Sequence, residues 1–272
     1  MQQPIGVFDS GVGGLSVLRA LREALPHEHW VYVADSGHAP YGERNDDYVL
    51  QRSHAITDYL LDTHRIKAMV VACNTATAAA IGTLRAAYPD LPIVGIEPAL
   101  KPATQASKTG RVGVMATRGT LSSDKFAALL GSLHGQATFV LQPCDGLADA
   151  IERFDTPRIE ELCRRYIREM GHFGTSSNAM DTLVLGCTHY PFVADVLKDV
   201  TGPEVTQIEA GAPVARRTQR VLELAGIAQA PEEIARSNGV TTHFFSTGNT
   251  LLLEAAIQRW LHESAPVMSL GI

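Results

Sequence analysis

The stretch Ala68-Met69-Val70-Val71-Ala72-Cys73-Asn74-Thr75 decides the fold class of this chain. Its first five residues form a continuous apolar run, which is typical of a strand buried on both faces of a parallel sheet. Polar residues follow directly, where such a strand gives way to a helix. The stretch therefore predicts a β–α unit with Cys73 beyond the carboxyl end of a strand, which is the edge where open parallel sheets bind ligands.

Similar short apolar runs recur along the chain and alternate with segments of helical periodicity. Helical spacing is clear in Leu15–Leu25, Tyr48–Leu61 and Leu251–Leu261. The alternation predicts an α/β protein with mainly parallel sheets. Strands are expected at Ile5–Phe8, Trp30–Ala34, Ala68–Ala72, Ile93–Ile96, Val112–Met115, Thr138–Leu141, Thr182–Leu185, Val205–Ile208 and Val240–Phe245.

A second stretch repeats the pattern of the first. The run Leu183-Val184-Leu185-Gly186 leads into Cys187-Thr188-His189, and the two cysteines are 187 − 73 = 114 positions apart, about one α/β lobe. We expect two Rossmann-like lobes related by a pseudo-twofold axis, with both thiols in the cleft between them. Crossings near 97–102 and 210–213 place residues 1–97 and 212–272 in the first lobe and 98–211 in the second.

Composition narrows the classes of function. The 272 residues carry a formal net charge of −6, and the short basic clusters suit solvated helix faces better than a nucleic-acid surface. The N-terminal residues show no secretory signal, and no run of about 18 apolar residues could span a membrane. The four cysteines are too sparse for a disulfide framework and indicate reduced thiols in the cytoplasm.

The matched cysteines suggest proton transfer. A thiolate could take a proton from one face of a substrate carbon while a thiol returns one to the other face, and nearby donors favour the thiolate. A buried cysteine is more often a small core residue, but two in matching contexts weaken that interpretation. No C-x-x-C pair or second ligand motif accompanies Cys187-Thr188-His189, so neither a metal site nor dithiol redox chemistry is expected.

Further polar residues follow expected strands, and each has a structural alternative. Asp9 and His189 could assist the thiols, although Asp9 could equally cap a helix. The glycine-rich run Ser10-Gly11-Val12-Gly13-Gly14 could offer N–H groups to an anion or simply form a tight turn. Thr117 and Thr120 could donate hydroxyls to a carboxylate or cap a helix.

Taken together, these motifs resemble those of glutamate racemases in the aspartate/glutamate racemase superfamily. The matching segments occur in the family's order and span nearly the whole chain. They are Val7–Val17, Pro40–Gly42, Val70–Ala76, Val94–Ala99, Ala116–Thr120 and Leu185–Pro191.

The resemblance implies a role for each matching residue. Cys73 and Cys187 would be the two acid/base thiols acting on Cα of glutamate, assisted by Asp9 and His189. Glu152 is a further candidate, matched by a short local alignment. The resemblance implies substrate contacts from Asp9, Ser10, Tyr41, Gly42, Asn74, Thr75, Thr117, Thr120 and Thr188.

The resemblance also implies a dimer that needs no pyridoxal phosphate or metal and supplies D-glutamate for peptidoglycan. Two alternatives stay open from the residues alone. One is a racemase of the same superfamily acting on aspartate or another amino acid. The other is a two-lobed small-molecule binding protein whose buried cysteines perform no chemistry.

Overall fold

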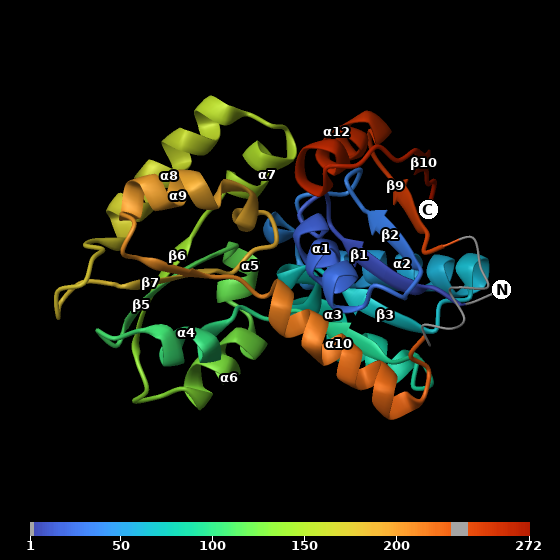
Figure 1. Cartoon of the computed structure of the whole chain (residues 1–272), viewed down its shortest axis with the longest axis horizontal. Coiled ribbons are helices and arrows are strands. Elements are labelled where there is room, and N and C mark those ends of the chain that lie inside the picture. The colour runs from blue at the N-terminus through green and yellow to red at the C-terminus, as the bar shows by residue number, and fades with distance from the viewer. Residues whose placement is uncertain (1–2, 230–238) are drawn as a thin grey trace.

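The computed structural model describes residues 3–229 and 239–272, and its strands form two parallel sheets (Figure 1). The strands of the first sheet are β1 (Ile5–Asp9), β2 (Trp30–Ala34), β3 (Ala68–Val71), β4 (Ile93–Gly95), β9 (Thr242–Ser246) and β10 (Val267–Ser269). The strands of the second sheet are β5 (Arg111–Ala116), β6 (Thr138–Pro143), β7 (Thr182–Leu185) and β8 (Thr206–Ile208).

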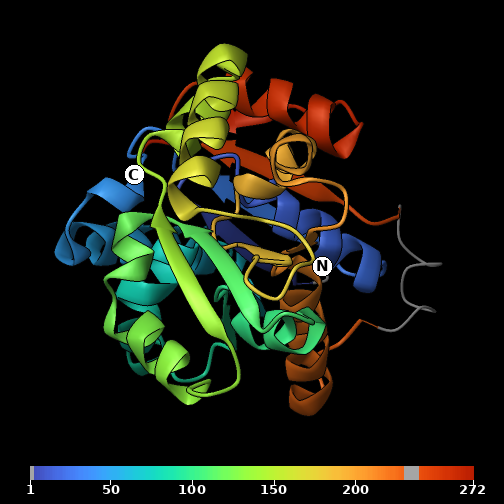
Figure 2. The same ribbon diagram turned by 90° about the vertical axis from the view of Figure 1, so that its left-hand side faces the viewer.

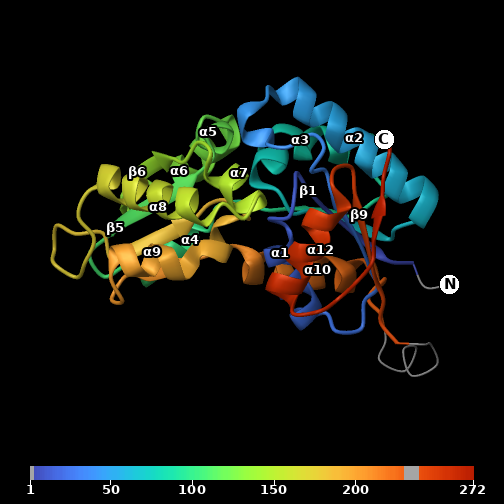
Figure 3. The same ribbon diagram turned by 90° about the horizontal axis from the view of Figure 1, so that it is seen from above.

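Helices precede or follow the strands in both lobes, which lie side by side (Figures 1 and 3). The first lobe holds α1 (Leu15–Ala24), the 3-10 turn η1 (Tyr41–Glu43), α2 (Asp46–His64), α3 (Asn74–Ala87), α10 (Gly211–Ala225) and α12 (Thr250–Leu261). The second holds α4 (Leu100–Ala106), α5 (Arg118–Leu121), α6 (Asp124–Ser132), α7 (Leu147–Glu152), α8 (Thr156–Met170), the 3-10 turn η2 (Tyr190–Val193) and α9 (Ala194–Thr201).

The two sheets share one internal topology. Their strand orders are β10-β9-β2-β1-β3-β4 and β6-β5-β7-β8, so the run β2-β1-β3-β4 has the same order as the whole second sheet. In each case the first strand of the lobe pairs with the second and the third, and all these pairs are parallel. As a result β3 and β7, which precede the two cysteines, occupy equivalent places.

Both sheets are covered by helices on both faces, which explains the continuous apolar runs. In β3, Val70 packs with α1, α10 and α12, whereas Met69 and Val71 face α2 and α3. In β7, Val184 faces α4 and α6, while Leu183 and Leu185 pack against α7, α8 and α9. Figure 2 views these layers from the side of the second lobe. Period-2 alternation of polar residues is absent from these strands because no face of either one meets water.

The expected α/β class with mainly parallel sheets is confirmed, and each expected strand overlaps an observed one. The edge strand β10 was missed, because only two apolar residues, Val267 and Met268, stand between Pro266 and Ser269 and they do not form an apolar run. The first sheet draws its strands from residues 5–95 and 242–269, and the second from 111–208. α10 begins directly after β8 and packs on α1 of the first lobe, so we propose lobe boundaries near residues 97 and 212.

Leu18 tests the core of the first lobe. Its side chain in α1 is fully buried between the sheet, α10 and α12. We expect Leu18→Ala to lower the free energy of unfolding by about 2–5 kcal/mol, because it removes buried methyl groups and leaves a cavity. Urea unfolding measures the change. Leu224→Ala on α10, where the side chain is 71% exposed, is the control and should change it by less than about 0.5 kcal/mol; equal effects would contradict the packing described.

Candidate functional site

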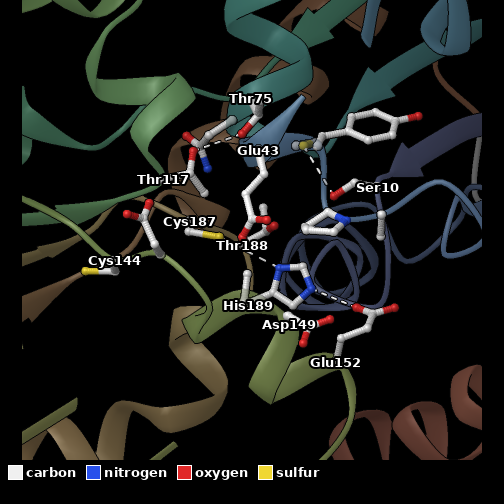
Figure 4. A pocket seen from close by; sticks show the side chains of 18 of the residues that line it. Ser10, Glu43, Thr75, Thr117, Cys144, Asp149, Glu152, Cys187, Thr188 and His189 are labelled. Atoms are coloured by element: carbon white, nitrogen blue, oxygen red, sulfur yellow. Dashed lines mark hydrogen bonds and ion pairs between the residues drawn. The ribbon is translucent and has the colours of Figure 1, made fainter. Parts of the chain in front are cut away.

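A pocket lies between the lobes, at the carboxyl ends of their strands (Figure 4). Most of the residues singled out from the sequence line it: Ser10, Tyr41, Gly42, Cys73, Asn74, Thr75, Thr117, Glu152, Cys187, Thr188 and His189. The other two lie behind its wall. Asp9 is fully buried next to Ser10, and Thr120 accepts a hydrogen bond from Thr117 (Oγ1–Oγ1 2.9 Å). The structure thus brings the expected residues together; that they perform chemistry stays a prediction.

Equivalent strands deliver the two thiols. Cys73 lies two residues beyond the last residue of β3, and Cys187 lies two residues beyond the last residue of β7. Both side chains line the one pocket, although they are only 4% and 7% exposed. The repeated topology therefore explains how residues 114 positions apart come to share a cleft (187 − 73).

Cys73 sits in a site that keeps it protonated. It is the N-cap of α3, where its Sγ accepts a hydrogen bond from the Ala76 N–H (3.4 Å). Its thiol donates to the Ser10 hydroxyl (3.7 Å). Burial, and after it the nearby charge of Asp9, raise the pKa of the Cys73 thiol well above its usual value. Without substrate, Cys73 is accordingly a thiol.

Asp9 does not cap a helix. α1 begins after Gly14 with no side-chain cap, and the Asp9 carboxylate instead accepts from the N–H and hydroxyl of Ser10 (2.6 and 3.1 Å). Its other oxygen accepts from the hydroxyl of Thr188 in the second lobe (3.0 Å). Burial raises the pKa of Asp9. Asp9 thus joins the lobes at the floor of the pocket and lies beside the Cys73 half of the site.

On the other side of the pocket, Cys187, His189 and Glu152 form a chain of contacts. His189 Nδ1 lies 3.7 Å from Cys187 Sγ, and its Nε2 lies 2.8 Å from a Glu152 oxygen (Figure 4). Burial alone would lower the pKa of His189, but its hydrogen bonds to Cys187 and Glu152 outweigh burial and raise that pKa well above its usual value. The positive charge of the imidazolium therefore lies next to Cys187 Sγ.

Glu152 is held by both lobes. One oxygen accepts from the Val12 N–H and from His189 (both 2.8 Å), and the other accepts from the Ser36 hydroxyl (2.7 Å). Burial opposes its ionisation, but these bonds prevail and lower the pKa of Glu152. The carboxylate is therefore ionised although it is buried.

The glycine-rich turn serves this contact between the lobes. A Cβ added at Gly11 would lie 2.3 Å from a Glu152 oxygen, and one at Gly13 would lie 2.3 Å from His189 Nδ1. The turn does offer an N–H group to an anion, as the sequence predicts, but Val12 donates to the protein's own Glu152. Glycine is required here for close approach of the second lobe.

The turn that carries Tyr41 and Gly42 is fixed by a buried network. The Tyr41 hydroxyl donates to Asp35, which Arg52 also binds through Nε and Nη2 (3.0 and 2.9 Å). Burial, and then Asp35, raise the pKa of Tyr41 well above its usual value. The Tyr41 hydroxyl is thus engaged away from the pocket, and the residue contributes its ring and the backbone of its turn to the wall.

The threonines meet where the lobes touch. Thr117 Oγ1 caps α5 by accepting from the Thr120 N–H (3.2 Å), so the capping interpretation is confirmed for this residue. Thr117 also lies 3.0 Å from the Thr75 hydroxyl of the first lobe. Nearby, the Asn74 Oδ1 is buried and finds no hydrogen-bond partner within the described residues. It is a free acceptor at the edge of the pocket.

Some lining residues were missed in the sequence. Several belong to the segment after β6 and the start of α7, and two others flank residues that were singled out. They are Glu43, Arg118, Cys144, Asp145, Gly146, Ala148 and Asp149. The strand-end rule that found Cys73 could have found Asp145 and Gly146, because they follow the expected strand Thr138–Leu141.

Two kinds of feature are absent from the described ranges, 3–229 and 239–272. No group of three His, Cys, Asp or Glu side chains in them is arranged to hold a metal ion. No helix in them is long and apolar enough to cross a membrane.

Comparison with known proteins defines the class of protein. The sequence model of the Asp/Glu/Hydantoin racemase family matches residues 5–215. The chain therefore belongs to this family of racemases.

Individual relatives share both sequence and fold. The chain is 46% identical to a glutamate racemase of Ectopseudomonas mendocina over 268 residues, which cover 98% of this chain and 97% of that one. Among solved structures it is similar to a glutamate racemase isoform of Bacillus anthracis (30% identity, TM-score 0.83, 99% and 98% covered). It is also similar to Escherichia coli glutamate racemase in complex with L-glutamate and the activator UDP-MurNAc-ala (28%, 0.81, 99% and 100%). The two-lobed α/β fold is thus common to all of these structures.

The charge on His189 makes a prediction about stability. Its pKa is raised in the folded state above the value near 6.5 of an unfolded chain. Between the unfolded-state pKa and the folded-state pKa of His189, the folded protein therefore binds more protons than the unfolded chain. The protonated His189 stabilises the fold fully below pH about 6.5, and this contribution is lost as pH rises through the folded-state pKa.

We expect the unfolding free energy of the wild type, relative to His189→Gln, to decline as pH rises above about 6.5. Urea unfolding of both proteins across neutral and alkaline pH measures the difference. A difference that stays constant with pH would mean that His189 is neutral in the folded protein.

Proposed function

We propose that this protein is a glutamate racemase, which interconverts L- and D-glutamate by proton transfer at Cα between two thiols and supplies D-glutamate for peptidoglycan. One observation carries the proposal: Cys73 and Cys187 follow equivalent strands of two lobes and line one pocket. A base on one face of Cα and an acid on the other invert the centre without a cofactor, so neither pyridoxal phosphate nor a metal is needed.

The unlike surroundings of the thiols provide the protonation states that such a reaction requires. Cys187 lies beside the His189 imidazolium and acts as the base, whereas burial and Asp9 keep Cys73 a thiol that acts as the acid. Proton removal by Cys187 and donation by Cys73 invert one enantiomer. The protein is then left with the opposite arrangement, which inverts the other enantiomer.

The substrate carries two carboxylates and an ammonium group. The first N–H groups of α3, at Asn74 and Thr75, have no partner within the helix and suit a carboxylate, as does the Thr188 hydroxyl. The buried, unpartnered Asn74 Oδ1 suits the ammonium. We propose that the remaining contacts come from Ser10, Tyr41, Gly42 and Thr117, with Asp9 and Thr120 supporting them from behind.

Stabilising the carbanion is the difficult part of this reaction. The negative charge that forms at Cα delocalises into the α-carboxylate, so donors fixed on that carboxylate lower the barrier. The start of α3 provides such donors together with the positive end of the helix dipole. Because the closed lobes leave little water in the pocket, these interactions act at low dielectric.

We further propose that the protein is a cytoplasmic homodimer. All four cysteines are free, which suits a reducing compartment. Apolar side chains are exposed on the edge strands of the two sheets, at Leu141 of β6 and Met268 of β10 (36% and 40%), and could contribute to contacts between subunits. Light scattering after size exclusion should give twice the chain mass of 29.3 kDa, and the monomer mass would refute the dimer.

The two-thiol mechanism predicts the behaviour of the cysteine variants. In deuterated water, metal-free and pyridoxal-free wild type should incorporate deuterium at Cα of both enantiomers of glutamate. Cys73→Ala and Cys187→Ala should each lose racemisation by about 10²–10⁴-fold or more, because each removes one partner of the proton transfer. Proton NMR and circular dichroism measure exchange and inversion.

Cys163→Ala is the matched control. This cysteine is fully buried in α8 outside the pocket, so its variant should retain activity. If the wild type exchanges the Cα proton of aspartate but not that of glutamate, the proposed substrate is wrong and the two-thiol mechanism still holds. If no amino acid exchanges in the wild type, the protein is a binding protein and the proposal is wrong.

A further inference from the structure

An aromatic cluster joins the lobes on the far side of His189 and Glu152. Trp260, in the last turn of α12, stacks on Phe192 with ring centroids 3.7 Å apart and planes 2° apart. It also stacks on Phe154, with centroids 5.2 Å apart and planes 30° apart. Trp260 belongs to the first lobe, whereas both phenylalanines belong to the second.

The two phenylalanines lie on the segments that carry His189 and Glu152. Phe192 is three residues beyond His189, and its N–H donates to the His189 carbonyl oxygen (3.1 Å). Phe154 is two residues beyond Glu152, just after α7 ends. The indole ring of Trp260 therefore contacts both segments close to the residues, His189 and Glu152, whose side chains line the pocket.

Backbone strain marks the same place. Phe154 has a φ of 56°, in the left-handed region that a bulky side chain rarely adopts. Such a conformation persists only where the surroundings fix it. Here the ring is held by Trp260, and the Arg259 guanidinium lies 5.8 Å from its centroid.

We infer that Trp260 is a positioning residue, which aligns His189 with Cys187 and Glu152 by stacking on Phe192 and Phe154. The inference rests on the proposed racemase function for its kinetic test, but the alignment itself does not need a substrate. Trp260 touches neither the pocket nor the thiols; it acts on the reaction through the two segments.

The kinetic test compares Trp260→Leu with Trp260→Phe. Leucine keeps an apolar side chain but removes the stacking. We therefore expect kcat to fall about tenfold, which corresponds to the free energy of one aromatic pair. KM for glutamate should change little. Trp260, Phe154 and Phe192 do not line the pocket, so the substitution removes no contact with the substrate. Phenylalanine can still stack and should retain most of the activity.

Two further variants separate positioning from general stability. Leu251→Ala, on the exposed face of the same helix, should leave kcat unchanged. If Trp260 acts through Phe192, the double variant Trp260→Leu/Phe192→Leu should be little worse than the worse single variant, because partners in contact are not additive. A wild-type kcat in Trp260→Leu, or losses that multiply in the double variant, would overturn the inference.

A readout without turnover keeps the test independent of the proposed function. The imidazole resonance of His189, assigned with His189→Gln, is titrated by NMR in wild type and in Trp260→Leu. Loosening its contacts should move the pKa of His189 down towards its usual value, and an unchanged titration would also overturn the inference. A wild type that fails to invert glutamate would refute the proposed function alone.

Discussion

The carboxylate of Glu152 is bonded by both lobes, and the arrangement of side chains in the cleft depends on it. A buried carboxylate is tolerated only when its oxygens are bonded, and here the partners are divided between the lobes. Val12 and Ser36 belong to the first lobe and His189 to the second. Opening the cleft would remove the two first-lobe donors from Glu152 and leave His189 as its partner, so the closed arrangement is needed to bond both carboxylate oxygens.

This contact makes the two halves of the site chemically unlike although their strands are arranged alike. β1 and β5 are equivalent in topology, but one ends in Asp9 and the other leads to Thr117. Cys73 accordingly faces a carboxylate, and Cys187 faces an imidazolium. A symmetric frame thus brings the thiols together, while the side chains next to them differ: Asp9 lies on the Cys73 side and His189 on the Cys187 side. The proposed reaction needs one base and one acid, and unlike surroundings suit that division between the two thiols.

Much of the fold could be predicted from the sequence because its determinants are local. Val70 and Val184 lie in apolar runs that show strands buried on both faces, and the residue after such a run marks the ligand edge. Thr117 and Cys187 were found by this rule. The rule fails for contacts set by tertiary packing. No pattern near Trp260 shows that its ring meets Phe192, and the glycine run near Val12 reads as an anion site without revealing that the anion is Glu152.

The burial of the two thiols and of the carboxylates next to them restricts access to the site. Asp9 and Glu152 each bind a donor from the opposite lobe, so opening the cleft breaks both contacts and exposes both carboxylates to water. Water solvates the released carboxylates, which lowers the cost of opening compared with breaking equally many apolar contacts. Thiols that are almost fully buried can meet a charged substrate only after such an opening. The polar contacts at the pocket can thus be exchanged for water, whereas the stacking of Trp260 on Phe154 and Phe192 is an apolar contact that holds the lobes together beside it.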